Sequence, residues 1–429
     1  MKYPYLALSI LYFLFFSLQP HLTGQYFPPA SDIAWEKVDP QALGWDKTSL
    51  DELRDYLEEA HTKAFVIIKD GKIAVEWYLN GHARTTPWYW ASAGKTLTAG
   101  LVGIAAQEGK LQLTDPTSKY LGRWTSCSLE DESKIQIIHQ LTMTSGLNEF
   151  LGFDCLEPAC LKCLAMPGTR WTYHNGPYTL LDGVIENATG KNLTEYFRSR
   201  IGDKIDMQGT FISLNNVNVF YSTALDAARY GYLLLNQGKW KGSVIINEPF
   251  VYDLSHPSQQ LNQSYGLLTW LNGQASHKLP GEVGTFQGPI IPEGPDDLYA
   301  ALGKNDQKIH VVPSLNLVLI RFGDAAITGS EEYVPVNLDN EIWKHLNRAF
   351  GTNTGTLEIN NKLESSTGES SVIVRKMDKS SSNQLFDVSG RMINYSYGSH
   401  FEAFGLTPGI YFFRGIKENK RVVEKLLVY

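Results

Sequence analysis

Residues 88–96 limit the fold and the chemistry of this chain more than any other segment. They read Trp-Tyr-Trp-Ala-Ser-Ala-Gly-Lys-Thr and place Ser92 three positions before Lys95. The apolar residues 97–104 that follow are compatible with a helix. Because positions i and i+3 share one face of a helix, we expect the hydroxyl and the amine to lie side by side. A lysine withdrawn from water can take the proton of such a serine and make it a nucleophile. The same spacing also occurs on ordinary solvated helix faces, so the motif needs support from elsewhere.

Two later segments supply that support in a fixed order. Residues 167–175 end in Tyr173, His174 and Asn175, and the triplet Ala-Leu-Gly at residues 301–303 precedes a strand-like run at residues 308–313. Taken alone, Tyr173 is compatible with an ordinary half-buried aromatic residue that has no role in catalysis. Asn175 is likewise compatible with a residue that only caps a turn. Their order along the chain, after Ser92, is what gives them a functional interpretation.

In these motifs, and in residues 107–120, 135–147 and 222–231, the chain resembles the serine beta-lactamase-like hydrolases. That family includes class C beta-lactamases, D-Ala-D-Ala peptidases, esterases and 6-aminohexanoate-oligomer hydrolases. The resemblance covers about residues 64–342 and implies an α+β fold: a beta-lactamase/transpeptidase-like antiparallel sheet flanked by helices, with a mainly helical subdomain. A hairpin pattern around Asp70 and Gly71, with strand patterns near residues 299–323, fits the same architecture.

The resemblance also implies roles for individual residues. Ser92 is the expected nucleophile, Lys95 the group that takes its proton, and Tyr173 the second acid/base group. This arrangement works if the Lys95 ammonium lies against the phenol and lowers the tyrosine pKa. Asn175 is expected to hydrogen-bond the substrate or Lys95. The backbone N–H of Ser92 and one from the strand after Gly303 would bind the oxyanion. Two-step acyl transfer through an acyl-enzyme follows, with no metal and no organic cofactor.

The third motif narrows the substrate. Ala301, Leu302 and Gly303 stand where lactamases and peptidases of the family carry Lys-Thr-Gly, or His in place of Lys, whose cation holds a substrate carboxylate. Lys304 or Arg321 could replace that cation, but neither occupies its position. The departure favours small-molecule esters or amides, or short peptide-like substrates, without an essential carboxylate. The alternatives are a beta-lactamase or D-Ala-D-Ala carboxypeptidase acting on peptidoglycan-like substrates, and a non-catalytic binding protein on the same fold.

Other function classes fit poorly. Gly94, Lys95 and Thr96 imitate the end of a phosphate-binding loop, but Tyr89 stands where that loop needs its first glycine. No Gly-x-Ser-x-Gly elbow occurs, which argues against an α/β-hydrolase triad. A net charge of −7 gives no electrostatic basis for nucleic-acid binding. His139, His174 and His310 are expected to be structural.

The N-terminus and the cysteines indicate export. Lys2 and the apolar residues 6–18 predict a signal peptide over residues 1–24, since the apolar run is shorter than the ~20 residues of a membrane span. An uncleaved anchor is the alternative, and no later segment is long and apolar enough to span. The four cysteines favour disulfides over a zinc site, with the pairing left open; they are Cys127, Cys155, Cys160 and Cys163.

The domain plan places the hydrolase domain at residues 25–350, a linker rich in Gly, Thr, Asn and Ser at 351–371, and a small β-sandwich at 372–429. That last segment carries nine basic and five acidic residues. Its Gly390-Arg391 turn and Pro-Gly-Ile-Tyr-Phe block at 408–412 resemble the C-terminal sorting domain of type IX secretion substrates in Bacteroidota, although the usual Tyr-Pro-Asn-Pro opening is missing. The resemblance implies a secreted or surface-attached protein and the type IX machinery as partner. An accessory binding module is the alternative.

Overall fold

The computed structural model describes residues 25–214, 217–282, 284–329 and 332–351, together with the backbone of six strands between residues 373 and 428. The expected signal peptide and residues 352–371 of the expected linker lie outside the described residues. Among the described helices, none combines the length and the apolar character that crossing a bilayer requires.

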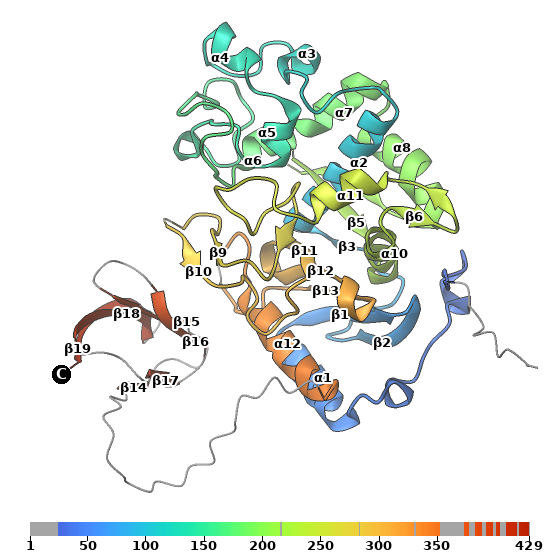
Figure 1. Ribbon diagram of the computed structural model, residues 1–429. Coiled ribbons are helices and arrows are strands. Elements are labelled where there is room, and N and C mark those ends of the chain that lie inside the picture. Colours follow the sequence, from blue (N-terminus) through green and yellow to red (C-terminus); the bar gives the residue numbers. More distant parts are fainter. Residues whose placement is uncertain are drawn as a thin grey trace, which may run out of the picture.

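A six-stranded antiparallel sheet forms the base of the molecule (Figure 1). Its strands, in spatial order, are β2 (Lys72–Tyr78), β1 (Thr62–Lys69), β13 (Leu317–Gly323), β12 (Gln307–Val312), β11 (Tyr299–Gly303) and β8 (Trp270–Leu271). The predicted hairpin joins β1 to β2 through Asp70 and Gly71, which both have positive φ, at 52° and 81°. A left-handed pair of this kind is what a tight hairpin turn demands.

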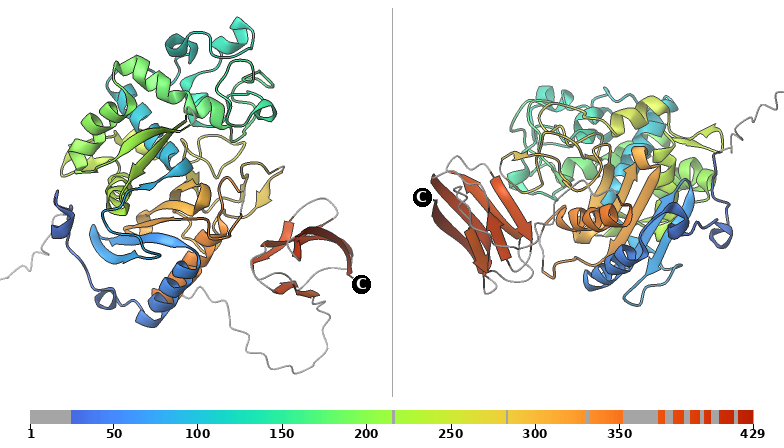
Figure 2. Two further views of the ribbon diagram at one scale, coloured as in Figure 1. Left: turned by 180° about the vertical axis from the view of Figure 1, so that it is seen from behind. Right: turned by 60° about the horizontal axis from the view of Figure 1, so that its bottom comes forward.

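Helices cover both faces of this sheet. On one face, Gly231 of α10 (Ala224–Leu235) packs so closely that a Cβ there would lie 2.5 Å from Val318 of β13. On the other, Trp343 of α12 (Asn337–Ala349) donates its Nε1 hydrogen to Nδ1 of His310 on β12 at 3.1 Å. Beside α12 lies α1 (Lys47–Glu59), and Figure 2 shows the two running together across the sheet. Both amphipathic helices bury their apolar stripe there.

Between the two sets of sheet strands the chain builds the helical part expected from the sequence. Its central helix, α2 (Gly94–Gln107), is buried at every position from Gly94 to Ala105. The other helices are α3 (Ser118–Leu121), α4 (Leu129–Ser133), α5 (Ile137–Leu141), α6 (Asn175–Thr179), α7 (Leu181–Thr189), α8 (Leu193–Phe197), α9 (Asp203–Ile205) and α11 (Glu248–Leu254), with a π-helical turn at Arg198–Gly202. A three-stranded sheet that we did not predict lies among them, in the order β3 (Trp88–Tyr89), β5 (Val217–Ser222) and β4 (Thr210–Leu214).

The remaining described elements are short or lie near the C-terminus. Two small hairpins pair β6 (Lys239–Trp240) with β7 (Ser243–Val244), and β9 (Ser276–His277) with β10 (Phe286–Gln287). Toward the C-terminus the predicted strands form two sheets. One pairs β14 (Ile373–Lys376) with β17 (His400–Ala403), and the other has the order β16 (Met392–Tyr397), β15 (Ser382–Asp387), β18 (Gly409–Lys417), β19 (Lys420–Val428).

Candidate active site

Ser92 sits in a short turn that leads from β3 into α2. The turn is a 3-10 helix, η3 (Ala91–Ala93). It is anchored by Trp90, which is fully buried and donates its indole hydrogen to Ser222 Oγ of β5 at 2.9 Å. Ala91 has a φ of +48°, a left-handed conformation that is costly for a residue with a Cβ. The surrounding structure therefore imposes this turn, and it leaves Ser92 partly exposed above a buried helix.

Lys95 lies one turn further on, against the serine. Its Nζ donates a hydrogen bond to Ser92 Oγ at 2.8 Å, which is the i, i+3 contact expected from the sequence. The lysine is only 3% exposed. Burial lowers its pKa to about 7, and the carboxyl groups of Asp154 and Asp182 oppose that shift. Near neutral pH a substantial fraction of the amine is therefore unprotonated and able to accept the serine proton.

Tyr173 joins the same cluster from the segment before α6. Its ring centroid lies 5.0 Å from Lys95 Nζ, and the residue is only 3% exposed. Its buried hydroxyl has no hydrogen-bond partner among the described residues. Burial raises the pKa of Tyr173, and the Ser92 hydroxyl acts in the opposite sense. Our expectation of a lowered tyrosine pKa is therefore wrong, because burial raises this pKa more than the Ser92 hydroxyl lowers it. The phenol is held neutral, in the form that donates a proton.

Asn175 does not hydrogen-bond Lys95 in this structure. Its Nδ2 donates to Asp154 Oδ1 at 2.7 Å, and its own Oδ1 is buried without a partner among the described residues. The neighbouring Gly176 lets the preceding loop approach closely, since a Cβ there would lie 2.3 Å from the carbonyl oxygen of Cys155. An exposed carboxylate, Asp154, is thus fixed beside the start of α6.

The cysteines form two disulfides, Cys127–Cys163 and Cys155–Cys160. This excludes the zinc alternative for these four residues and settles the pairing that the sequence left open. The second bond begins one residue after Asp154, so it restrains the loop that carries this carboxylate beside the cluster.

The third motif runs directly beside the serine. Ala301, Leu302 and Gly303 are buried on β11, and a Cβ on Gly303 would lie 2.6 Å from the carbonyl oxygen of Trp90 and 3.0 Å from the amide nitrogen of Ser92. Only glycine fits this contact. Strand β11 is therefore placed to present backbone groups to a substrate bound at Ser92, while Ala301 brings no charge.

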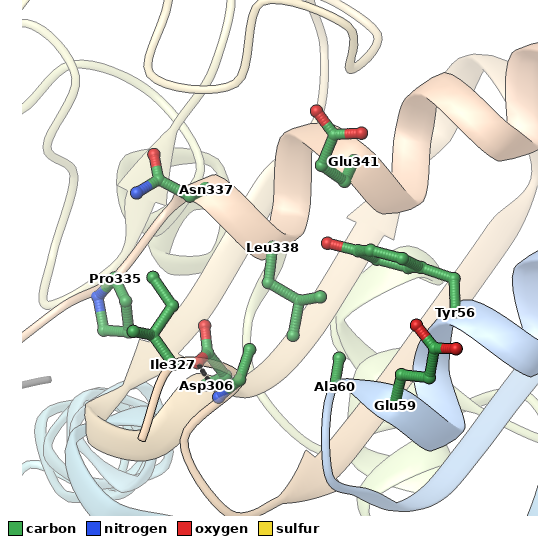
Figure 3. Close-up of a pocket in the computed structure, with 10 residues that line it drawn as sticks. Tyr56, Glu59, Ala60, Asp306, Ile327, Pro335, Asn337, Leu338 and Glu341 are labelled. Carbon is green, nitrogen blue, oxygen red and sulfur yellow. Dashed lines mark hydrogen bonds between the residues drawn. The ribbon is translucent and has the colours of Figure 1, made fainter. Parts of the chain in front are cut away.

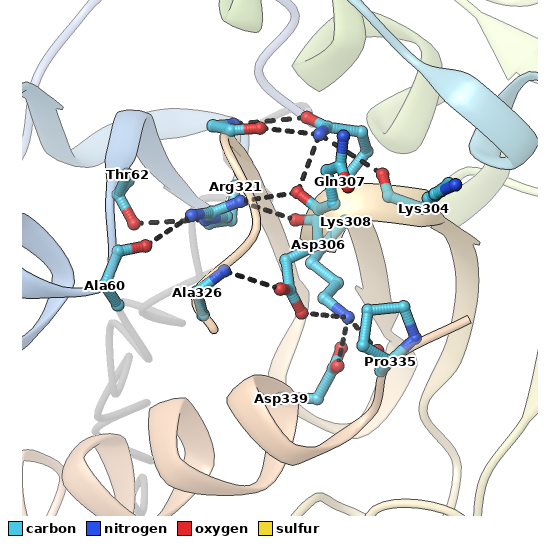
Figure 4. A network of polar contacts seen from close by, with 12 residues as sticks. Ala60, Thr62, Lys304, Asp306, Gln307, Lys308, Arg321, Ala326, Pro335 and Asp339 are labelled. Atoms are coloured by element: carbon cyan, nitrogen blue, oxygen red, sulfur yellow. Dashed lines mark hydrogen bonds and ion pairs between the residues drawn. The ribbon is translucent and has the colours of Figure 1, made fainter. Parts of the chain in front are cut away.

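Of the two cations considered for that role, Arg321 is excluded (Figure 4). It is fully buried, and its guanidinium is committed to oxygen atoms of the protein at 2.7–3.1 Å; these belong to Ala60, Thr62, Asn305, Asp306 and Asp324. Lys304 is exposed and follows Gly303 directly. Of the two cations, it is the one that is open to solvent.

His310 and Lys308 also belong to the buried polar network beneath the sheet. Lys308 Nζ lies 2.5 Å from Asp339 Oδ2, and His310 Nε2 lies 2.6 Å from Asp339 Oδ1. These groups satisfy one another, as the structural interpretation of His310 requires. A hollow beside this network, between α1 and α12, is lined by Tyr56, Glu59 and Glu341 among others and by none of the predicted site residues (Figure 3).

Three residues of the site escaped the sequence analysis: Tyr178, Asp182 and Asp154. The Tyr178 ring lies 4.2 Å from Lys95 Nζ, closer than the Tyr173 ring. Tyr178 and Asp182 are four residues apart in the helical segment that starts at Asn175, so helical spacing would have placed them on one face. Asp154 gave no comparable signal, because its position depends on a loop and a disulfide.

Comparisons with known proteins show what parts of this chain are similar to. Residues 53–241 match the Beta-lactamase family model. A 6-aminohexanoate-dimer hydrolase of Paenarthrobacter ureafaciens is 21% identical over 238 residues, which cover 48% of this chain and 59% of that protein. A teichoic acid D-alanine hydrolase of Staphylococcus aureus is 32% identical over 128 residues, 28% of this chain and 31% of that protein. The chain thus matches less than two thirds of the length of either relative.

The solved structures establish the fold. A candidate beta-lactamase from Bacteroides dorei DSM 17855 superposes with a TM-score of 0.57 at 17% identity, covering 71% of this chain and 99% of that one. The predicted beta-lactamase/transpeptidase-like fold is confirmed. The fold and the family match together support a serine hydrolase of the beta-lactamase type.

Proposed function

We propose that this protein is a secreted serine hydrolase that cleaves an ester or amide through an acyl-enzyme on Ser92. The observation that carries the proposal is the 2.8 Å hydrogen bond between Ser92 Oγ and the buried amine of Lys95. A buried lysine of lowered pKa beside a partly exposed serine is what an activated nucleophile needs. The hydrolase names of the two relatives support the same reaction type.

In the proposed reaction, Ser92 Oγ attacks the substrate carbonyl carbon while its proton passes to Lys95 Nζ. The oxyanion is bound by backbone N–H groups, that of Ser92 and one following Gly303. The neutral phenol of Tyr173 gives a proton to the leaving alcohol or amine. Water then enters along the reverse course, and the acid group is released with Ser92 regenerated. Each step transfers a proton between groups of this one cluster.

The substrate class follows from the third motif. Because Ala301 is neutral and Arg321 is buried, a substrate carboxylate finds no charge-assisted partner at the usual position. This supports esters or amides that lack an essential carboxylate. Within the site, Lys304 favours the second candidate, a beta-lactamase or D-Ala-D-Ala carboxypeptidase, because this exposed lysine follows the motif directly.

The test compares substrates on wild-type protein and on Ser92→Ala. We expect short acyl esters of p-nitrophenol to turn over faster than nitrocefin, and a fluorophosphonate probe to label wild type once, at Ser92. Ser92→Ala should lose both turnover and the adduct. Faster hydrolysis of nitrocefin would favour the second candidate. A folded wild-type protein that never forms an adduct would instead favour a non-catalytic binding protein.

Export completes the proposal. We propose that residues 1–24 direct the chain across the inner membrane, that residues 25–350 form the hydrolase domain, and that residues 372–429 direct it through the type IX machinery across the outer membrane. The two disulfides are consistent with an extracellular protein, because such bonds persist in oxidising compartments.

A further inference from the structure

A buried carboxyl group lies behind the lysine of the site. Helix α6 passes through Leu180, which keeps helical dihedrals, directly into α7, so Tyr178 and Asp182 lie one turn apart on the same side. The Tyr178 ring contacts Lys95 Nζ at 4.2 Å. Asp182 therefore faces the part of α2 that carries Lys95, and the charges of these two residues act on each other.

The surroundings of Asp182 are those of a group held in place. Its side chain is buried, with the residue 6% exposed. Oδ2 accepts a hydrogen bond from Asn218 Nδ2 of β5 at 3.0 Å, whereas Oδ1 has no partner among the described residues. Burial raises the pKa of Asp182 to about 7, Asn218 and Lys95 oppose this shift, and Glu186 adds to it. A buried carboxyl group with a single neutral anchor is costly unless a nearby cation compensates.

We propose that Asp182 is a positioning residue for acylation: anchored by Asn218, its carboxylate stabilises the ammonium that Lys95 becomes when it takes the Ser92 proton. The inference rests on the proposed function and deepens it. In the step concerned, Ser92 Oγ forms its bond to the acyl carbon and the hydroxyl proton moves to Lys95 Nζ. Asp182 takes no proton and does not touch the substrate.

Other ionisable groups also face this pair, and each lies on a different part of the chain. They are Ser92 on η3, Tyr173 before α6, Tyr178 on α6, Asp154 on the preceding loop, and Glu186 on α7. Tyr265, before β8, lies behind them, against the ring of Tyr173. Among these groups, only Asp154 and Glu186 are carboxylates, and they add their negative charge to that of Asp182. Asp154 is exposed, so water and salt weaken its effect on the amine. Asp182 is the carboxylate that solvent screens least.

The experiment measures how fast a fluorophosphonate inactivates the full chain between pH 5 and pH 9. In this reaction Ser92 Oγ bonds to phosphorus, fluoride leaves, and the serine proton passes to Lys95 and then to water. For wild type we expect the second-order rate constant to rise through a midpoint near the lysine pKa of about 7. For Asp182→Asn we expect the midpoint to fall by about one pH unit, since an opposite charge no longer favours the ammonium. The high-pH plateau should fall about threefold, because the lysine becomes a weaker base and a Brønsted slope below one transmits only part of a tenfold loss of basicity to the rate.

The control is Glu186→Gln, which removes one negative charge from the next turn of α7. Because that charge acts on Asp182 and not on Lys95, the midpoint should move far less than in Asp182→Asn. An Asp182→Asn profile with the wild-type midpoint overturns the inference, even if the rate is lower at every pH, because a purely structural role predicts that result. If Asp182→Asn does not fold, Asn218→Leu leaves the carboxyl group without its anchor and should lower the midpoint by a smaller amount; an unmoved midpoint overturns the inference equally. Failure of the proposed function is distinct: wild type then forms no adduct.

Discussion

The burial of Lys95 lowers the stability of the protein and at the same time gives the amine the lowered pKa that the proposed reaction needs. Taking a charged amine out of water costs free energy. Because burial disfavours the charged form, the lysine pKa falls from its ordinary 10.5 to about 7. Between these two pH values the unfolded chain binds more protons than the folded one. Lys95 therefore lowers the free energy of unfolding most at and below pH 7. This loss of stability shrinks as the pH rises toward 10.5.

Lys95→Met should therefore stabilise the protein while abolishing turnover. We expect the free energy of unfolding to rise at pH 7 by a few kcal/mol, since each pKa unit corresponds to ~1.4 kcal/mol. The gain should shrink at pH 9.5. Urea unfolding at both pH values measures it, with Lys110→Met, a change at an exposed lysine just beyond α2, as control. A gain that is absent at pH 7, or equal at both pH values, would contradict this account.

At the scale of elements, the site depends on how closely strand β11 approaches the turn η3. Gly303→Ala should lower kcat/KM for p-nitrophenyl esters by about 100-fold, because a Cβ 2.6 Å from the Trp90 carbonyl forces the strand or the serine turn to move. Gly94→Ala is the matched control. Its Cβ would meet only Phe220 Cβ, at an ordinary 3.7 Å, and kcat/KM should stay near wild type. Equal activity in the two variants would mean that β11 does not position the site.

The elements that local pattern determines were predictable, and those that depend on tertiary contact were not. The hairpin of β1 and β2 and the helix α1 follow from turn residues and apolar spacing. The sheet of β3, β5 and β4 escaped prediction, because β4 is largely exposed and has no apolar alternation. From the sequence alone, residues 342–350 are predicted to form the closing helix of the domain. In the structure this helix, α12, begins earlier, at Asn337, because Leu338 packs in the core and Asp339 belongs to the buried polar network.

The site shows the same division. The contact of Ser92 with Lys95 could be read from their spacing, and Tyr173 from the order of motifs. The neutral phenol could not, because a pKa depends on burial that the sequence does not display. Arg321 misled us for a related reason: in an apolar strand its sequence position cannot show whether the guanidinium reaches solvent or is enclosed.

At the scale of the whole molecule, the prediction concerns processing in the native host. On the proposed export route, in which both signals are removed during passage, we expect the mature protein to begin near residue 25 and to lack residues 372–429. Edman sequencing and the intact mass of the secreted material check this. A chain without residues 372–429 should remain behind the outer membrane. Secreted protein that keeps its C-terminus would refute the sorting interpretation and favour an accessory module.

The buried guanidinium of Arg321 has a consequence for the evolution of this protein. It binds the start of β1, the connection between β11 and β12, and the chain just past β13, and so ties three strand ends together near Gly303. New substrate preferences can arise through substitutions at exposed positions such as Lys304, which leave the contacts of Arg321 intact. A substitution of Arg321 itself would move the strand ends that position Gly303 and would change the binding of every substrate.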